Sequence, residues 1–200
     1  MRNRHAADIA SNLMLAINST VLKALPGVEV ESTVDKAGPS DSSFLLHLRR
    51  EGIWFEFAEI QIRVYEGDSV LSFEVFAELE VQDFLGRTKM ESVNIEDLMQ
   101  RYSSYNPVIS HGLVHTLDPA KKGASDGGKT TATRSIKIRF EIFDRDIAEK
   151  EDGIYDYDLA EVAEKAVPCV KALYEIHKDA YSGLVVGKDE HFDNGFKPGF

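Results

Sequence analysis

Apolar side chains recur every three or four residues near both ends of the chain, which is the period of a helix packed on one face. Over 5–25, the apolar positions spaced by four are Ile9, Leu13, Ile17, Val21 and Leu25. Pro26-Gly27 then ends the pattern. The second pattern begins after Asp158, whose side chain suits an N-cap, and runs to about Ala180. We therefore predict a long helix near each end.

Between these helices, apolar and polar residues alternate one by one, as in strands with one buried face. Two long alternating runs, 53–66 and 70–82, are joined by Glu66-Gly67-Asp68-Ser69, so we expect a hairpin there. The alternation slips by one residue near Ala58. Because a slip of one residue exchanges the two faces, we predict a bulge or a strong bend at that point.

Further strands and one short helix complete the predicted order. The segment RSIKIRFEIF, 134–143, alternates strictly, which is typical of a half-buried antiparallel strand. Shorter runs predict strands at 28–34, 43–50 and 106–117. Asn94 is expected to cap a short helix that ends near Tyr102. This order predicts an α+β fold: an antiparallel sheet of five or six strands, with long N-terminal and C-terminal helices packed on it and a short inserted helix.

The domain organisation follows from the lack of repeats and of a long Ser- or Gly-rich linker. We expect a single α+β domain over 1–183 and a C-terminal tail over 184–200. The tail contains Phe192, Phe196 and Phe200, spaced by four, with Gly and Pro between them that disfavour a helix. These phenylalanines are expected either to pack back onto the sheet or to dock onto another protein.

Composition narrows the class of protein. Of the 200 residues, 43% are hydrophobic and 28% are charged, as in a folded globular chain. The formal net charge of −11 repels nucleic acid and anionic membranes at long range. No run approaches the ~18 apolar residues of a membrane span. The only cysteine, Cys169, lies in an apolar helical pattern and is expected to be a buried thiol. Together these features predict a cytoplasmic protein.

Residues 123–130, GASDGGKT, fit the phosphate-loop template G-x-x-x-x-G-K-[ST]. In a true phosphate loop the segment leads from a buried strand into a helix, whose N-terminal amides bind the phosphates. Here the residues that follow Thr130 alternate as in a strand, and Asp118-Pro119 separates the loop from the preceding apolar run. We therefore predict that this segment is the tip of a hairpin, and we expect no nucleotide cofactor.

The same loop is basic, although the chain as a whole is acidic. Its anion-binding candidates are Lys121, Lys122, Lys129 and Arg134. A mobile basic tip on an acidic protein could hold an anionic partner, since long loops are often functional. The alternative is a solvated turn whose glycines and lysines serve turn geometry and solubility.

Carboxylates and histidines supply the remaining candidates for chemistry. Glu56 and Glu59 lie near the slip in the central hairpin, where paired carboxylates could serve as acid and base. His111 and His115 are four residues apart and form a weak candidate for a metal site, because an extended strand separates such residues by about 13 Å. The other histidines are scattered, with no nucleophile signature beside them: His5, His47, His177 and His191.

These observations favour binding over catalysis. We expect a non-enzymatic protein-binding module of the adaptor, chaperone or inhibitor type, which uses the sheet surface, the basic hairpin tip or the aromatic tail. Its partner is expected to be another protein, and sheet edges also allow a homodimer. The alternative is an enzyme that acts on a phosphorylated or nucleic-acid substrate through Glu56 and Glu59, with Lys129 or Arg134 holding the anion.

Overall fold

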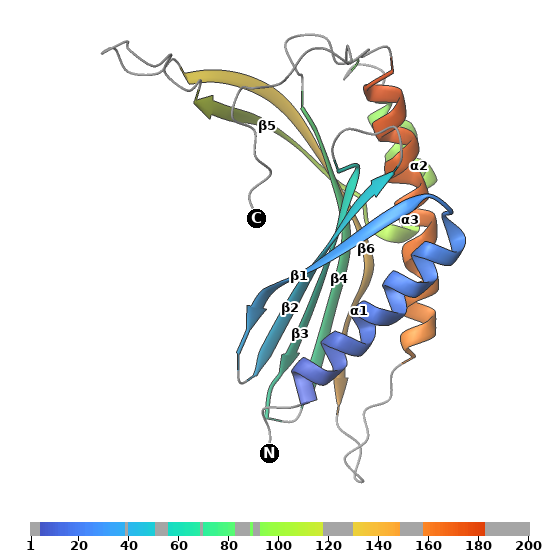
Figure 1. The fold of residues 1–200 in the computed structure, drawn as a ribbon. Coiled ribbons are helices and arrows are strands. Elements are labelled where there is room, and N and C mark those ends of the chain that lie inside the picture. The colour runs from blue at the N-terminus through green and yellow to red at the C-terminus, as the bar shows by residue number, and fades with distance from the viewer. Residues whose placement is uncertain are drawn as a thin grey trace.

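The computed structural model shows a six-stranded sheet with its helices on one side (Figure 1). It describes residues 5–38, 40–50, 56–68, 70–82, 89, 93–117, 130–148 and 158–182. The strands are β1 (Val28–Ala37), β2 (Asp41–Arg50), β3 (Ala58–Glu66), β4 (Val70–Gln82), β5 (Val108–Leu117) and β6 (Thr130–Ala148). The helices are α1 (His5–Ala24), α2 (Ile95–Arg101), the 3-10 turn η4 (Ser103–Tyr105) and α3 (Leu159–Ala180). The predicted α+β fold is confirmed.

The strand order is β1-β2-β3-β4-β6-β5, and all neighbouring strands are antiparallel. The first four strands follow one another along the sheet, and the predicted hairpin of β3 and β4 is confirmed. β6 then pairs with β4 on one side and β5 on the other. The sheet therefore ends in β1 at one edge and β5 at the other.

The predicted interruption near Ala58 is present. β3 begins at Ala58, so Glu56 and Phe57 precede the strand. Phe57 and Ala58 are both buried, although strict alternation would place neighbours on opposite faces. The backbone N–H of Phe57 donates to the carbonyl oxygen of Leu48 at 3.0 Å, which keeps this stretch attached to β2.

A second irregularity, in β6, was not predicted. The pairing with β4 passes from Phe76 opposite Glu141 to Val75 opposite Phe143, which leaves Ile142 as an extra residue. Ile142 is buried, and Phe143 packs against the core with its ring centroid 6.2 Å from that of Phe73. The bulge therefore exchanges the faces, and β6 continues beyond the predicted end to Ala148.

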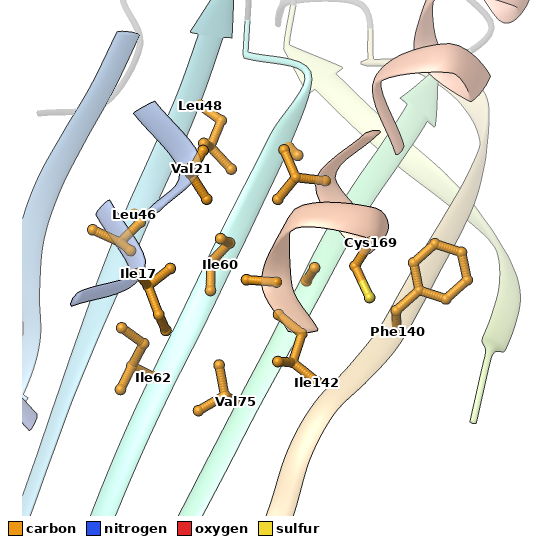
Figure 2. Packing of buried hydrophobic residues seen from close by; sticks show 14 of the residues in the cluster. Ile17, Val21, Leu46, Leu48, Ile60, Ile62, Val75, Phe140, Ile142 and Cys169 are labelled. Carbon is orange, nitrogen blue, oxygen red and sulfur yellow. The ribbon is translucent and has the colours of Figure 1, made fainter. Parts of the chain in front are cut away.

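The core lies between the sheet and the helices. α1 contacts β1, β2 and β3, while α3 contacts β3, β4 and β6 and also packs against α1. Figure 2 shows Ile17 and Val21 of α1 beside residues of β2 and β3, all of them buried. The same view places Cys169 of α3 close to Phe140 of β6. Cys169 is fully buried and burial raises its pKa to about 12, so it is a neutral packing group, as predicted.

The short inserted helix closes one end of this core. The side chain of Asn94 accepts a hydrogen bond from the backbone N–H of Asp97 at 3.1 Å, which confirms the predicted N-cap of α2. After η4, Asn106 adopts a left-handed conformation with φ 43° that turns the chain into β5. Tyr102 packs its ring 5.1 Å from that of Phe140, so this connection lies on the helix side of the sheet.

Asp158 caps α3 as predicted, because its Oδ1 accepts from the backbone N–H groups of Ala160 at 2.8 Å and of Glu161 at 3.2 Å. We expect Asp158→Ala to lower the free energy of unfolding by about 1 kcal/mol, since two amides at the helix start lose their acceptor. Urea unfolding measures the change. Glu164→Gln, at an exposed position of the same helix, is the control and should change it by less than about 0.5 kcal/mol. Equal effects would show that the cap contributes nothing specific.

Candidate functional site

The phosphate-loop-like segment ends in a strand. β6 begins at Thr130, which pairs with Leu117 of β5 in antiparallel register. The prediction that an extended, sheet-paired segment follows Thr130 is confirmed. The geometry required of a phosphate loop is a parallel strand that leads into a helix, and here the loop connects two antiparallel strands.

The basic candidates are only partly described. Lys121, Lys122 and Lys129 lie outside the described residues, as do the tail residues Phe192, Phe196 and Phe200. Arg134 lies on β6 opposite Leu113, at a position in phase with the buried Ile136. It therefore projects from the helix side of the sheet, at the end of β6 that extends past Gln82 of β4. Figure 1 shows that this end of the β5–β6 pair bends away from the helices.

His111 and His115 both lie on β5, opposite Ile136 and Ala132 of β6. An extended strand places residues four apart at a distance of about 13 Å, which is too far for one metal ion to bind both. Among the described residues, no group of three or more His, Cys, Asp or Glu side chains is arranged to hold a metal ion.

A hollow of about 540 Å³ lies beside the bulge of β6, next to η4 and the start of α3. Tyr105, Phe143 and Lys165 are among the residues that line it. Lys165 Nζ donates to Glu161 Oε1 at 2.6 Å and lies 5.9 Å from the centroid of the Phe143 ring. The hollow contains none of the site residues predicted from the sequence.

The candidate carboxylates Glu56 and Glu59 contact a histidine on the side of the sheet that faces away from the helices. We call the surface opposite the helices the open face. Its side chains alternate with the core residues along each strand. They are Glu29, Glu31, Thr33, Asp35 and Lys36 of β1; Asp41, Ser43, Leu45, His47 and Arg49 of β2; Glu59, Gln61, Arg63 and Tyr65 of β3; Ser72, Glu74, Phe76, Glu78, Glu80 and Gln82 of β4; Ser135, Lys137, Arg139, Glu141, Asp144 and Asp146 of β6; Val108, Ser110 and Gly112 of β5.

The open face brings the two candidate carboxylates to one histidine. Nδ1 of His47 lies 2.8 Å from Oε2 of Glu56 and 3.8 Å from Oε2 of Glu59. Nε2 of the same ring lies 3.4 Å from Oγ1 of Thr33. The side chains of His47, Glu56 and Glu59 are each about one-fifth to one-third exposed, so the group is partly shielded from water.

The sequence pattern alone indicates no role for His47, because its neighbours on the sheet depend on strand register. His47 is opposite Glu59 in the β2–β3 pairing, and Glu56 reaches it from the irregular stretch before β3. The alternation of His47 with the buried Leu46 and Leu48 was the available signal, because it placed the ring on the polar face of a strand. Which residue of the neighbouring strand lies opposite His47 depends on strand pairing, and alternation does not determine that pairing.

Ion pairs continue from this histidine toward β1. Arg49 Nη2 donates to Glu56 Oε1 at 3.1 Å and to Glu31 Oε2 at 3.4 Å. One guanidinium therefore connects a carboxylate of the edge strand to the carboxylate that holds His47. Because both contacts are exposed or half-exposed, their main effect is to orient the side chains, and each contributes little stability.

A second chain of contacts crosses the middle of the sheet. Gln61 Nε2 donates to Glu59 Oε1 at 2.9 Å, and Arg63 Nη2 donates to Gln61 Oε1 at 3.2 Å. Arg63 Nη1 lies 3.7 Å from Glu74 Oε2 on the next strand. Polar side chains from β2, β3 and β4 are thus held in fixed relative positions.

Apolar groups are interspersed with these charges. The guanidinium carbon of Arg139 lies 3.7 Å from the centroid of the Phe76 ring, within the range of a cation–π contact. Leu45 is half-buried, Tyr65 is 37% exposed and Val108 is 61% exposed. The open face therefore combines Arg, aromatic and aliphatic side chains with a surplus of carboxylates.

Neither α1 nor any other helix in the described ranges combines the length and apolar character needed to cross a membrane.

No protein-family model, curated protein or solved structure matches this chain.

Proposed function

We propose that the protein is a non-enzymatic protein-binding module whose binding surface is the open face. The observation that carries this proposal is that the helices contact only one side of a six-stranded sheet. No helix or strand in the described part of the chain packs across the other side. A broad rigid surface of this kind provides the area that a specific protein interface needs.

The side chains on this surface support the proposal. Arginine and aromatic residues are enriched at protein interfaces, and here Arg49, Arg63, Arg139, Phe76 and Tyr65 share one face. Several of them are held in place by neighbours before a partner arrives. This preorganisation lowers the entropic cost of binding, because fewer side chains must be immobilised on association.

A second candidate function rests on the contact between His47 and Glu56. A histidine whose Nδ1 is held by a carboxylate is the arrangement of a general base. The enzyme alternative for a phosphorylated or nucleic-acid substrate also needs a cation, and Arg134 projects from the opposite side of the sheet. A rise in Tm on addition of ATP or an oligonucleotide, lost in His47→Ala, would favour this alternative.

Homodimerisation stays a separate proposal. β1 is an edge strand whose side chains are mostly exposed, and edge strands can pair with a second copy. β1 also carries charged residues and an irregularity between Val34 and Lys36, which are features that protect edges from pairing. Light scattering of the purified protein distinguishes the two states.

The binding proposal can be tested by blocking the open face with a bulky thiol label. The native Cys169 is buried with a raised pKa, so it stays unreactive while an engineered surface cysteine is labelled. We expect Gln61→Cys, at the centre of the open face, to lose capture of its host partner at least about tenfold once coupled to a polyethylene glycol maleimide. Quantitative mass spectrometry of proteins captured from the native host measures the loss.

The matched control is Lys171→Cys, at an exposed position of α3 on the far side of the molecule. Labelled in the same way, it should capture the same protein as the unlabelled chain. Equal capture by both labelled variants would show that the open face is not the binding surface.

A further inference from the structure

The open face carries more carboxylates than basic groups. Its acidic residues in the strands are Glu29, Glu31, Asp35, Asp41, Glu59, Glu74, Glu78, Glu80, Glu141, Asp144 and Asp146, and its basic residues are Arg49, Arg63, Lys137, Arg139 and Lys36, which pairs with Asp41. The net charge of the whole chain, −11, has the same sign. The surface that we propose for binding is therefore a region of negative potential, which attracts cations and repels nucleic acid.

The basic residues of this face are already engaged. Arg49 contacts Glu31 and Glu56, and Lys137 Nζ lies 2.6 Å from Glu78 Oε1. Arg63 pairs with Glu74, while Arg139 stacks on Phe76. In contrast, Glu29, Glu80 and Asp144 are exposed and form no ion pair with any described residue. The charge that remains available to a partner is therefore negative.

Two cross-strand pairs place like charges opposite each other. Glu59 of β3 is opposite Glu78 of β4, and Glu74 of β4 is opposite Asp144 of β6. Directly opposite like charges destabilise a sheet. Lys137 already pairs with Glu78 and Arg63 with Glu74, so one carboxylate of each pair has a basic neighbour. The other carboxylates, Glu59 and Asp144, form no ion pair with a described lysine or arginine, and a cationic side chain of a partner would relieve the repulsion that remains. Glu74 and Glu78 are four residues apart on one strand, which spaces the two pairs by about 13 Å.

We infer that the partner of the open face is a basic polypeptide segment, rich in arginine or lysine. This inference rests on the proposed function and names the chemistry of the partner. Two basic side chains about 13 Å apart would match the spacing of the two like-charged pairs. Residues i and i+4 of an extended segment have this spacing. Such a complex draws its specificity and association rate from charge complementarity, so its affinity decreases as salt rises.

The test uses a synthetic octa-arginine peptide and the intact protein, with binding measured by calorimetry at low ionic strength. The open-face variant is Glu29→Gln/Glu80→Gln/Asp144→Asn, which removes three exposed carboxylates that form no ion pair with described residues. We expect it to bind the peptide about tenfold more weakly than the unaltered protein. An octa-glutamate peptide should not bind either protein.

The matched control is Glu164→Gln/Glu175→Gln/Asp179→Asn, which changes the net charge equally at exposed positions of α3 on the helix side. It should bind octa-arginine within about twofold of the unaltered protein. An equal loss of octa-arginine affinity in both variants would mean that binding depends only on the net charge of the protein, and would overturn the inference. Absence of octa-arginine binding would overturn it too. Thermal melts of both variants confirm that each is folded.

The two proposals fail separately. If the labelled open face loses its host partner but octa-arginine does not bind, the open face is a binding surface for a partner of other chemistry. If the label on the open face does not change capture of the host partner while octa-arginine binds to the open face, this face binds basic peptides but is not the interface for the host partner.

Discussion

Phe140→Ala is expected to lower the free energy of unfolding by about 3–5 kcal/mol, the largest effect that we predict for a single substitution. The Phe140 side chain is fully buried on β6, opposite Ala77 of β4. Its ring packs 5.1 Å from that of Tyr102, which holds the α2–η4 connection against the sheet. Removal of the ring therefore loses apolar burial and leaves a cavity between the sheet and the helix layer.

Urea unfolding followed by circular dichroism measures this change. The control is Val108→Ala on the neighbouring strand, because Val108 is 61% exposed and its loss should cost less than about 0.5 kcal/mol. A Phe140→Ala cost below about 1 kcal/mol would contradict the arrangement of the core. It would mean that the Phe140 ring is not enclosed between the sheet, α3 and the α2–η4 connection.

The second large effect is a dependence of stability on pH that arises from His177. This histidine of α3 is 3% exposed and packs its ring 4.6 Å from that of Tyr181 and 6.5 Å from that of Phe57. Burial disfavours the charged imidazolium and lowers the pKa of His177 to about 4 from its usual 6.5. Between these two pH values, the unfolded chain binds a proton at this position that the folded chain does not.

The free energy of unfolding should therefore be highest above about pH 6.5 and should fall as the pH drops toward 4, with a loss of about 3 kcal/mol from this group. Unfolding in urea at a series of pH values measures the slope. His177→Leu removes the titrating ring, so the variant should lack this loss and should gain about 3 kcal/mol in the free energy of unfolding relative to the unaltered protein as the pH falls from 6.5 to 4. Parallel slopes would show that His177 is not buried in its neutral form.

Other acid-sensitive contacts contribute less to stability than the burial of His177. The ion pairs of the open face are exposed or half-exposed, so their loss at low pH costs little stability. Under the proposed function, their contribution is to fix the positions of the side chains that a partner would contact.

Local sequence signals predicted most of the elements. Asn94 and Asp158 were identified as N-caps because their side chains accept hydrogen bonds from amides two or three residues ahead, a requirement that a short window contains. The strand after Thr130 was predicted from alternation alone, and it decided that the glycine-lysine segment lies between antiparallel strands. The extension of β6 past Phe143 was missed, because the bulge at Ile142 breaks the alternation.

The sequence by itself determined the helices, the strands and the chemical character of each face, because helical and strand periodicities are local and reveal which side of an element is buried. The tertiary structure alone decided that β6 lies between β4 and β5, that Glu56 and Glu59 meet His47, and that Glu74 lies opposite Asp144. These contacts join residues on different strands, so they depend on strand order and register. Both are set by pairing across the whole sheet, and no stretch of sequence contains them.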